Sequence, residues 1–516
     1  VFAALCAAAP PAPAQLYTRP ALKWETIRTA HFDVHFPSSM APWANDVAGR
    51  LEGIREAVVA VVGNAPASRV TVMIEDPYNI ANGAALPLLN APTIVLWPTP
   101  PEPAGDLGHS PDWPALLAVH EFTHIAHLTW PSRNPFDRAV WQLLPADLGP
   151  ISRRAPRWVI EGYATYVEGR LTGSGRPNSV VRAGVLRQFA IDGQLPTYGE
   201  LDANPQYLGG DMAYLVGSAF LEWLVARQGE ASLPHLWRRM TARTNRNFEA
   251  AFVGVFGETP DALYGRFTAD LTGKALQAAA LIRSSGLDSG ETFQHLSWYT
   301  GDPAVAPAGH RIAVPVRQFG ERTRIVVWST DPVPPDTERA AARARALALD
   351  PGDVASVSIH PDQRAPLAIL ESSHGRGFDH PRFFADGQRL LVSHEEPLPD
   401  GALRPDLFEW NLVSGKVRRL TRGAAIRDAD PSLGGKTAIG VRCLGGVCDV
   451  VLVDLIKGTV RVLLPGSPTR IYYRPRFAPD GRSVIVSVHD GTFWRLEIFA
   501  VQPRGLGAPK RIGPSD

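Results

Sequence analysis

Two histidines and a glutamate stand at a spacing that suits metal binding. His120 and His124 are four residues apart in an apolar stretch, and Glu121 follows the first of them. If this stretch is helical, residues four apart share a face, so both imidazole rings can bind one ion. Glu121 can then accept a proton from a water molecule beside that ion. This spacing predicts zinc-assisted hydrolysis, with two surface histidines on an ordinary amphipathic helix as the alternative.

The third ligand has two candidates. His127 is on the same face but about 10.5 Å beyond His120 on a straight helix, whereas zinc–nitrogen bonds are about 2 Å. We therefore predict that His127 is a helix-face residue near the site and not a ligand. Glu161 is the better candidate, because it is isolated among apolar residues at helical spacing and a carboxylate in that setting needs a partner. The alternative is a helix-start carboxylate stabilised by the helix dipole.

The segment around Glu161 resembles the third-ligand helix of the gluzincin metallopeptidases. The family motif is W-x-x-E-G-[FY]-A-x-x-x-E, and it is matched by Trp158, Glu161, Gly162, Tyr163, Ala164 and Glu168. Together with the upstream motif, the resemblance implies a thermolysin-like domain that binds one Zn²⁺ ion through His120, His124 and Glu161. It also implies that Glu121 is the general base and that the substrate is a protein or peptide.

The chain departs from this family pattern in three places. The 37 positions from His124 to Glu161 exceed the gap in many members, and we expect residues 131–156 to be a loop with one short helix. Thr165 stands where the thermolysin-like branch often has Asp, so the partner of a histidine ligand is not identified. The segment N-G-A-A-L at residues 82–86 lacks the Glu of the aminopeptidase strand, so aminopeptidase specificity is not predicted.

A tyrosine further along the chain is the candidate oxyanion donor. The segment that starts at Tyr214 resembles the Y-x-x-G-x-x-x-x-x-L helix of the same clan, whose tyrosine stabilises the tetrahedral intermediate. We predict this role for Tyr214, with Tyr207 as a weaker substitute. The alternative is a tyrosine that only packs in the core or at its rim.

The elements that must position these residues can be read from periodicity. Alternation and helical spacing predict a strand over residues 24–36, a helix over 42–62, and strands over 70–74 and 93–97. We expect strand 93–97 to line the cleft and pair with an extended substrate, with an interior position as the alternative. Asp112 is a suitable N-cap for the motif helix, and Pro114 suits its first turn.

Length and composition limit the classes of protein. The 516 residues are enough for two or three domains, and 45% hydrophobic with 20% charged residues is typical of globular proteins. The net charge of +1 gives no nucleic-acid-binding signature, and no apolar run is long enough to predict a membrane-spanning helix.

Residues 1–14 resemble the end of a secretory signal peptide. They are rich in Ala and Pro, contain Cys6, and end in the A-x-A pattern Ala12-Pro13-Ala14. The alternative is a disordered terminus. A signal peptide predicts an exported protein, periplasmic or extracellular, in which Cys443 and Cys448 could form a disulfide across a hairpin-like turn. Two free thiols in adjacent strands are the alternative.

The second half of the chain contains a repeat. After a predicted helix over residues 260–284, four similar segments each lead into an apolar run; they begin at Asp302, His380, Asp430 and Arg474. Spacings of 50 and 44 residues suit propeller blades, and the pattern P-x-F-x-x-D-G resembles TolB-like repeats. Residues 337–349 are predicted to be an inserted helix or loop, with a degenerate blade as the alternative. A β-sandwich is the alternative to the propeller.

These observations predict a multidomain chain of α+β and all-β parts. We assign residues 15–285 to a gluzincin-like metallopeptidase domain and 286–516 to a TolB-like β-propeller. Four or five blades are few for a closed ring, so we expect the propeller to be incomplete. The predicted function is an exported zinc peptidase whose propeller binds substrate or a protein partner. The alternatives are a zinc hydrolase of a non-peptide acyl substrate and a non-catalytic binding protein, although a structural metal site needs no base such as Glu121.

Overall fold

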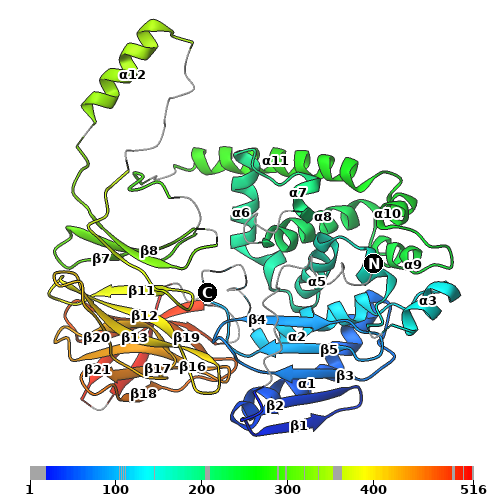
Figure 1. Ribbon diagram of the computed structural model, residues 1–516, viewed down its shortest axis with the longest axis horizontal. Coiled ribbons are helices and arrows are strands. Elements are labelled where there is room, and N and C mark those ends of the chain that lie inside the picture. The colour runs from blue at the N-terminus through cyan, green and yellow to red at the C-terminus, as the bar shows by residue number, and fades with distance from the viewer. Residues whose placement is uncertain are drawn as a thin grey trace.

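The computed structural model describes residues 19–513 except 104, 106, 108–109, 111, 145, 204–209, 287–289, 297–298, 319, 335, 353–362, 491–493 and 504. An N-terminal α+β region is followed by four antiparallel sheets, which stand beside the N-terminal sheet (Figure 1). The predicted signal peptide lies outside the described residues. Within the described residues, no helix has the length and hydrophobicity needed to cross a membrane.

The N-terminal sheet has five strands. In chain order they are β1 (Trp24–Arg28), β2 (Phe32–Pro37), β3 (Val70–Ile74), β4 (Asn82–Leu86) and β5 (Thr93–Trp97). The strand order is β1-β2-β3-β5-β4; β2, β3 and β5 are parallel, and the two edge strands are antiparallel to their neighbours. The prediction of one strand over residues 24–36 was wrong, because the chain reverses and forms the β1–β2 hairpin.

The predicted position of strand 93–97 at the lip of the cleft was also wrong. β5 lies between β3 and β4, and four of its five residues are buried, as an almost continuous apolar strand of a covered sheet requires. The edge is formed instead by β4, whose sequence N-G-A-A-L has little intrinsic preference for a strand. Pairing with β5 therefore decides its conformation.

The first two helices pack against this sheet. α1 (Ala41–Val62) ends at Gly63, whose φ of 83° is the left-handed conformation common after a helix. α2 (Trp113–Leu128) contacts α1, β4 and β5 and is almost completely buried. The predicted cap is confirmed, because the Asp112 carboxylate accepts a hydrogen bond from the backbone N–H of Ala115 (3.2 Å), and Pro114 lies in the first turn.

A helical layer completes the N-terminal region. It comprises α3 (Pro135–Gln142), α4 (Pro150–Arg154), α5 (Arg157–Thr172), α6 (Val180–Ile191), α7 (Tyr198–Ala203), α8 (Met212–Gln228), α9 (Ser232–Met240), α10 (Phe248–Phe256) and α11 (Pro260–Ser284). Single 3₁₀ turns occur at Ser38–Met40 and Arg176–Asn178. The segment 131–156 contains two short helices where one was predicted, and α11 has the predicted bounds.

Two glycines allow α5 and α8 to pack very closely. A Cβ added to Gly162 would lie 2.7 Å from the backbone carbon of Gly217, and one added to Gly217 would lie 2.6 Å from the carbonyl oxygen of Trp158. Only hydrogen in place of a side chain permits this approach. The glycines of the two sequence motifs therefore have a packing role, since they bring Glu161 on α5 and Tyr214 on α8 to the same side of α2.

The C-terminal region is a β-propeller-like array of four blades. The blades comprise β6 (Tyr299–Thr300), β7 (Ala304–Val305), β8 (Arg311–Arg317), β9 (Arg324–Ser329) and β10 (Ala368–Leu370); β11 (Phe378–Phe383), β12 (Arg389–Pro397), β13 (Leu403–Asn411) and β14 (Val417–Arg419); β15 (Ile426–Pro431), β16 (Thr437–Leu444), β17 (Val447–Asp454) and β18 (Val460–Leu464); and β19 (Ile471–Phe477), β20 (Ser483–His489), β21 (Trp494–Gln502) and β22 (Gly505–Ile512). The inserted helix is confirmed as α12 (Thr337–Leu349), which projects away from the first blade (Figure 1).

The last three blades share a backbone feature that accounts for the repeated sequence pattern. The first strand of each contains a register shift, and one residue of the shift has a positive φ: His380 (53°), Asp428 (54°) and Arg474 (49°). The third repeat therefore aligns at Asp428 rather than at the predicted Asp430. Arg474 also pairs with Asp302 at 2.7 Å, which links the fourth blade to the start of the first.

The two regions contact each other through backbone groups and a disulfide hairpin. Cys443 and Cys448 are bonded across the β16–β17 turn, which confirms that prediction. The turn approaches α1, because a Cβ on Gly446 would lie 2.4 Å from the Trp43 ring. Asn79 donates a hydrogen bond to the carbonyl of Cys443 (2.8 Å), and the Arg404 guanidinium donates to the carbonyl of Asp76 (2.7 Å).

Candidate metal centre

Two helices bring the three predicted ligands together. His120 and His124 project from one face of α2, with their Nε2 atoms 3.2 Å apart. Glu161, on the first turns of α5, has its Oε2 atom 3.3 Å from the Nε2 of His124 and 4.0 Å from that of His120. Both histidines are buried, and Glu161 is partly buried. The structure thus places the three residues in one cluster.

The geometry of this cluster fits a zinc ion. Ligand atoms that bind zinc tetrahedrally at about 2.0–2.1 Å are separated from each other by roughly 3.3 Å. Two of the three observed separations, 3.2 and 3.3 Å, are close to that value, and the third, 4.0 Å, is somewhat longer. Two imidazole nitrogens and one carboxylate oxygen are also the donor set of many zinc hydrolases, which keep a fourth position open.

Glu168 orients the first histidine. Its Oε2 atom lies 2.7 Å from the Nδ1 of His120, and it also accepts hydrogen bonds from the backbone and the guanidinium of Arg176 (3.0 and 3.3 Å). Burial favours the neutral acid, but Arg176 and then His120 outweigh burial and hold the pKa of Glu168 below its usual value. An ionised carboxylate only accepts hydrogen bonds, so Nδ1 carries the proton and Nε2 points its lone pair into the cluster.

The orienting residue was not identified from the sequence. Glu168 was noted only as a motif match, and the position checked for a partner was Thr165, which is buried and whose hydroxyl has no partner among the described residues. Glu168 is two helical turns after Glu161, so the same face of α5 carries the third ligand and the partner of the first. The 3.6-residue period is the signal that could have identified it.

Glu161 and His124 shift each other's pKa. Burial raises the pKa of Glu161, but His124 and then His120 overcome it and bring the pKa to about 2. Burial alone lowers the pKa of His124, whereas Glu161 reverses the direction and raises it. The two histidines therefore keep Glu161 in the ionised form that a metal ligand requires.

Glu121 lies beside the ligands and beneath the edge strand. It is buried, and this burial raises its pKa against the opposing effect of His120 and His124. A Cβ added to Gly83 on β4 would lie 2.5 Å from the Oε1 of Glu121. The backbone of β4 therefore passes directly over this carboxylate, and the free edge of the sheet borders the cluster.

The candidate oxyanion donor also reaches the cluster. The ring of Tyr214 stacks on that of His120, with centroids 6.1 Å apart, and the guanidinium of Arg176 lies 4.6 Å from the centre of the tyrosine ring. Burial raises the pKa of Tyr214, so the phenol keeps its proton. Its predicted role as a donor is compatible with this position and stays a prediction. The substitute, Tyr207, lies outside the described residues.

His127 has a different environment. Its ring is fully buried between Tyr163 and Trp237, with centroid distances of 4.6 and 4.2 Å, and it is not one of the clustered ligands. Burial lowers its pKa far below the usual value, so the imidazole is neutral. The structure places His127 in the aromatic core behind the site, as a helix-face residue.

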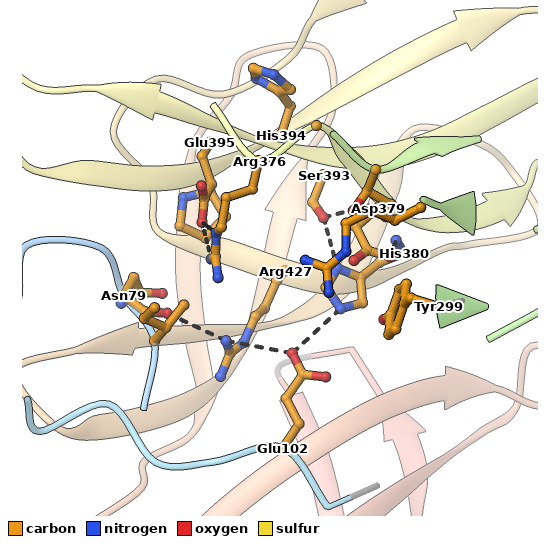
Figure 2. A pocket seen from close by; sticks show the side chains of 15 residues that line it. Asn79, Glu102, Tyr299, Arg376, Asp379, His380, Ser393, His394, Glu395 and Arg427 are labelled. Atoms are coloured by element: carbon orange, nitrogen blue, oxygen red, sulfur yellow. Dashed lines mark hydrogen bonds and ion pairs between the residues drawn. The ribbon is translucent and has the colours of Figure 1, made fainter. Parts of the chain in front are cut away.

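A polar cavity lies between the two regions, and it was not predicted from the sequence. It has a volume of about 210 Å³ and is lined by Asn79 and Glu102 from the N-terminal region and by blade residues (Figure 2). His380 and Arg427 each approach one carboxylate oxygen of Glu102 at 3.9 Å. Its lining residues come from both regions and are spread along the sequence from Asn79 to Arg427, so no local sequence pattern predicts it.

Solved structures resemble this chain over only part of its length. No protein-family model matches the chain, and no curated protein matches it in sequence. Similar solved structures include TolB from Acinetobacter baumannii (18% identity, 41% of this chain, 45% of that chain, TM-score 0.25). They also include a putative TolB from Agrobacterium tumefaciens (13%, 41% and 63%, TM-score 0.29) and the β-propeller domain of the Trilobed protease from Pyrococcus furiosus (11%, 42% and 57%, TM-score 0.26). The chain thus covers less than two thirds of each, and no function is inferred from them.

Proposed function

We propose that this protein is a zinc-dependent peptidase of the gluzincin type. The observation that carries the proposal is the convergence of His120, His124 and Glu161 from two helices, with Glu121 directly beside them. A zinc ion bound there would polarise a substrate carbonyl group and activate a water molecule. Three protein ligands with an adjacent carboxylate distinguish this arrangement from a structural zinc site, which usually has four protein ligands.

The protein's own groups supply the remaining steps. Glu121, beside the ligands, would accept a proton from the attacking water and deliver it to the leaving amine, and its raised pKa suits an acid–base group. Glu168 and Arg176 keep the His120 ring in the orientation that directs Nε2 into the cluster. Tyr214, stacked on that ring, is the candidate donor to the developing oxyanion.

The edge strand supports a peptide as the substrate. An extended peptide can add to a free strand edge through main-chain hydrogen bonds, and β4 offers such an edge next to Glu121. This recognises the backbone of the substrate rather than a particular side chain. The strand therefore favours a peptide over other acyl compounds.

The propeller-like region would control access to the metal cluster or bind a protein partner. It contacts the segment that follows β3 through Asp76 and Asn79, close to the strand next to the cluster. We propose that it binds substrate or a protein partner, and that the protein works in an exported, oxidising compartment. The Cys443–Cys448 disulfide supports the second point, since such bonds persist outside the reducing cytosol.

The test is removal and return of the metal. Cleavage of an unfolded protein should stop after chelation and resume when Zn²⁺ is added to the wild-type chain. Glu161→Ala should show no cleavage at the same zinc concentration, while a control away from the cluster, Glu258→Ala, whose side chain is 40% exposed, should behave as wild type. Cleavage that survives complete chelation would refute the proposal. Hydrolysis of esters without any peptide cleavage would replace it with the acyl-hydrolase alternative.

A further inference from the structure

A second cluster of two histidines and a glutamate lies in the second blade. His394 and Glu396 are two residues apart on β12, so their side chains leave the same face of the strand. His374 comes from the segment between β10 and β11. The Oε1 atom of Glu396 is 2.9 Å from the Nδ1 of His394 and 3.4 Å from the Nε2 of His374. All three ligand atoms lie within 4.8 Å of one another.

Neighbouring groups determine where His394 carries its proton. The hydroxyl of Ser372 donates to the carbonyl of His374 (2.9 Å), so its oxygen is left to accept a hydrogen bond from the Nε2 of His394 at 2.7 Å. The carbonyl of His374 accepts from the same nitrogen at 3.2 Å. A carbonyl oxygen has no proton to give, so its 3.2 Å contact with Nε2 favours the tautomer in which Nε2 is the N–H.

This assignment leaves a lone pair that faces a carboxylate. With Nε2 as the N–H, the neutral His394 ring directs the Nδ1 lone pair at the Oε1 of Glu396, and two electron-rich atoms 2.9 Å apart need a cation. Metal-binding histidines commonly donate their other N–H to a backbone carbonyl, as His394 does. The cation can be a metal ion or a second proton on the ring, and His374 provides a further ligand that a proton would not need.

The surroundings hold two ligands firmly and leave the third accessible. Arg419 donates to the Oε2 of Glu396 (3.0 Å), which fixes the carboxylate and leaves Oε1 to the cluster. The side chain of His394 is 1% exposed, whereas that of His374 is 56% exposed, so an ion can enter from solvent. Gly375 turns the chain at a φ of 63° and packs near the carbonyl of Glu395, which keeps His374 over the strand.

We propose that His374, His394 and Glu396 bind a second divalent ion, with Zn²⁺ as the ion that suits two imidazoles and one carboxylate. The proposal goes beyond the proposed peptidase function and does not depend on it. Its structural consequence concerns the cavity between the two regions. Arg376, two residues after His374, lines that cavity and donates to Glu395 (2.8 Å), so an ion on His374 would hold this segment at the cavity wall (Figure 2).

The experiment counts zinc ions on the purified full-length chain after chelation, reloading and removal of free metal. Wild type should retain about two ions per chain, and Glu161→Ala should retain about one. In that Glu161→Ala background, His374→Ala should reduce the count to about zero, and Zn²⁺ should no longer raise the melting temperature. His310→Ala is the matched control, since it removes an exposed blade histidine that also has an acidic neighbour, Asp331 at 3.5 Å.

The outcomes separate the two sites. Loss of zinc from wild type to about one ion per chain in His374→Ala, with peptide cleavage retained, is the expected result. If Glu161→Ala alone binds no zinc, the second site is refuted and the His394–Glu396 contact is a proton-mediated ion pair. If His374→Ala keeps both ions, the ligand assignment is refuted. Because His374 is exposed, its removal should leave the fold intact, which the unfolding curve of the chelated proteins will show.

Discussion

The two clusters contain the same three residue types but lie in different secondary structures. On α2 the ligands are four residues apart, and Glu121, next to His120, stays near the cluster because a helix turns by only about 100° per residue. On β12 the ligands are two residues apart, and Glu395, next to His394, points to the opposite face and pairs with Arg376. Figure 2 shows Glu395 directed toward the cavity and His394 directed away from it.

Because of this difference, we expect different chemistry from two clusters with similar ligands. The helical cluster has a carboxylate beside it that can move a proton, while the neighbouring glutamate of the strand cluster is already engaged in an ion pair. The helical cluster is also enclosed, whereas the strand cluster has one exposed ligand. We therefore expect hydrolysis only at the first cluster and metal-dependent stabilisation at the second.

The largest difference between the clusters should appear when the two adjacent glutamates, Glu121 and Glu395, are changed. Glu121→Gln should reduce the rate of peptide cleavage by about 10²- to 10⁴-fold with zinc content unchanged, because the amide cannot accept a proton. Glu395→Gln should leave the rate within about twofold, since this residue faces away from both clusters. Steady-state cleavage and zinc counts on the same samples provide the measurement. Equal losses in both variants would remove the distinction.

The next contrast concerns the groups that orient a histidine in each cluster. Glu168→Gln should weaken zinc binding at the first cluster by roughly 10- to 100-fold, because the amide no longer fixes the Nδ1 proton of His120. Ser372→Ala should weaken only the second cluster, and by less, because the carbonyl of His374 still accepts from His394. Competition with a chromophoric chelator measures both affinities. An unchanged affinity in Glu168→Gln would show that this carboxylate has only a packing role.

A smaller effect is expected from the strand that covers the first cluster. Gly83→Ala places a methyl group against Glu121 and the side chain of Leu117, so the carboxylate must shift. We expect kcat to fall by about 10-fold, since displacement of a reacting group by a fraction of an ångström weakens proton transfer. Zinc content should stay the same. Gly184→Ala, which meets no atom within 4 Å, is the matched control, and its kcat should not change.

Glu75 contrasts with Glu161, because it is a buried carboxylate without a close cation. Neither oxygen has a hydrogen-bond partner among the described residues, and burial raises its pKa to about 7 despite Arg19. The unfolded chain, with a pKa near 4.5, loses this proton first, so stability should fall as the pH rises from about 4.5 to about 7. Glu75→Gln should remove this slope and raise stability at pH 8 by on the order of 2 kcal/mol.

Thermal unfolding at pH 5 and pH 8 measures this effect. The melting temperature of Glu75→Gln should exceed that of wild type clearly at pH 8 and only slightly at pH 5. The same substitution at Glu161, whose pKa is already about 2, should produce no such gain at pH 8, because His124 and His120 stabilise its charge. A gain at pH 5 as large as that at pH 8 would contradict the assignment of the raised pKa to Glu75.

Much of the fold could be predicted from local patterns. The bounds of α11, the cap at Asp112, the inserted helix α12 and the Cys443–Cys448 pair all follow from signals within a few residues. The errors occurred where pairing between distant segments decides the structure. β4 has a weak strand sequence and was not predicted, and β5 was expected at the edge because periodicity does not reveal which strand pairs with which.

The sequence by itself determined the helical spacing of His120, Glu121 and His124 and the motif around Glu161, because a helix repeats every 3.6 residues and residue type then decides what lies on one face. Only the tertiary structure decided that Glu168 contacts His120, that β4 lies over Glu121, and that His374 meets the side chains of β12. Each of these contacts joins segments about 20 to 50 residues apart. Their approach depends on helix packing and strand pairing, which no local period encodes.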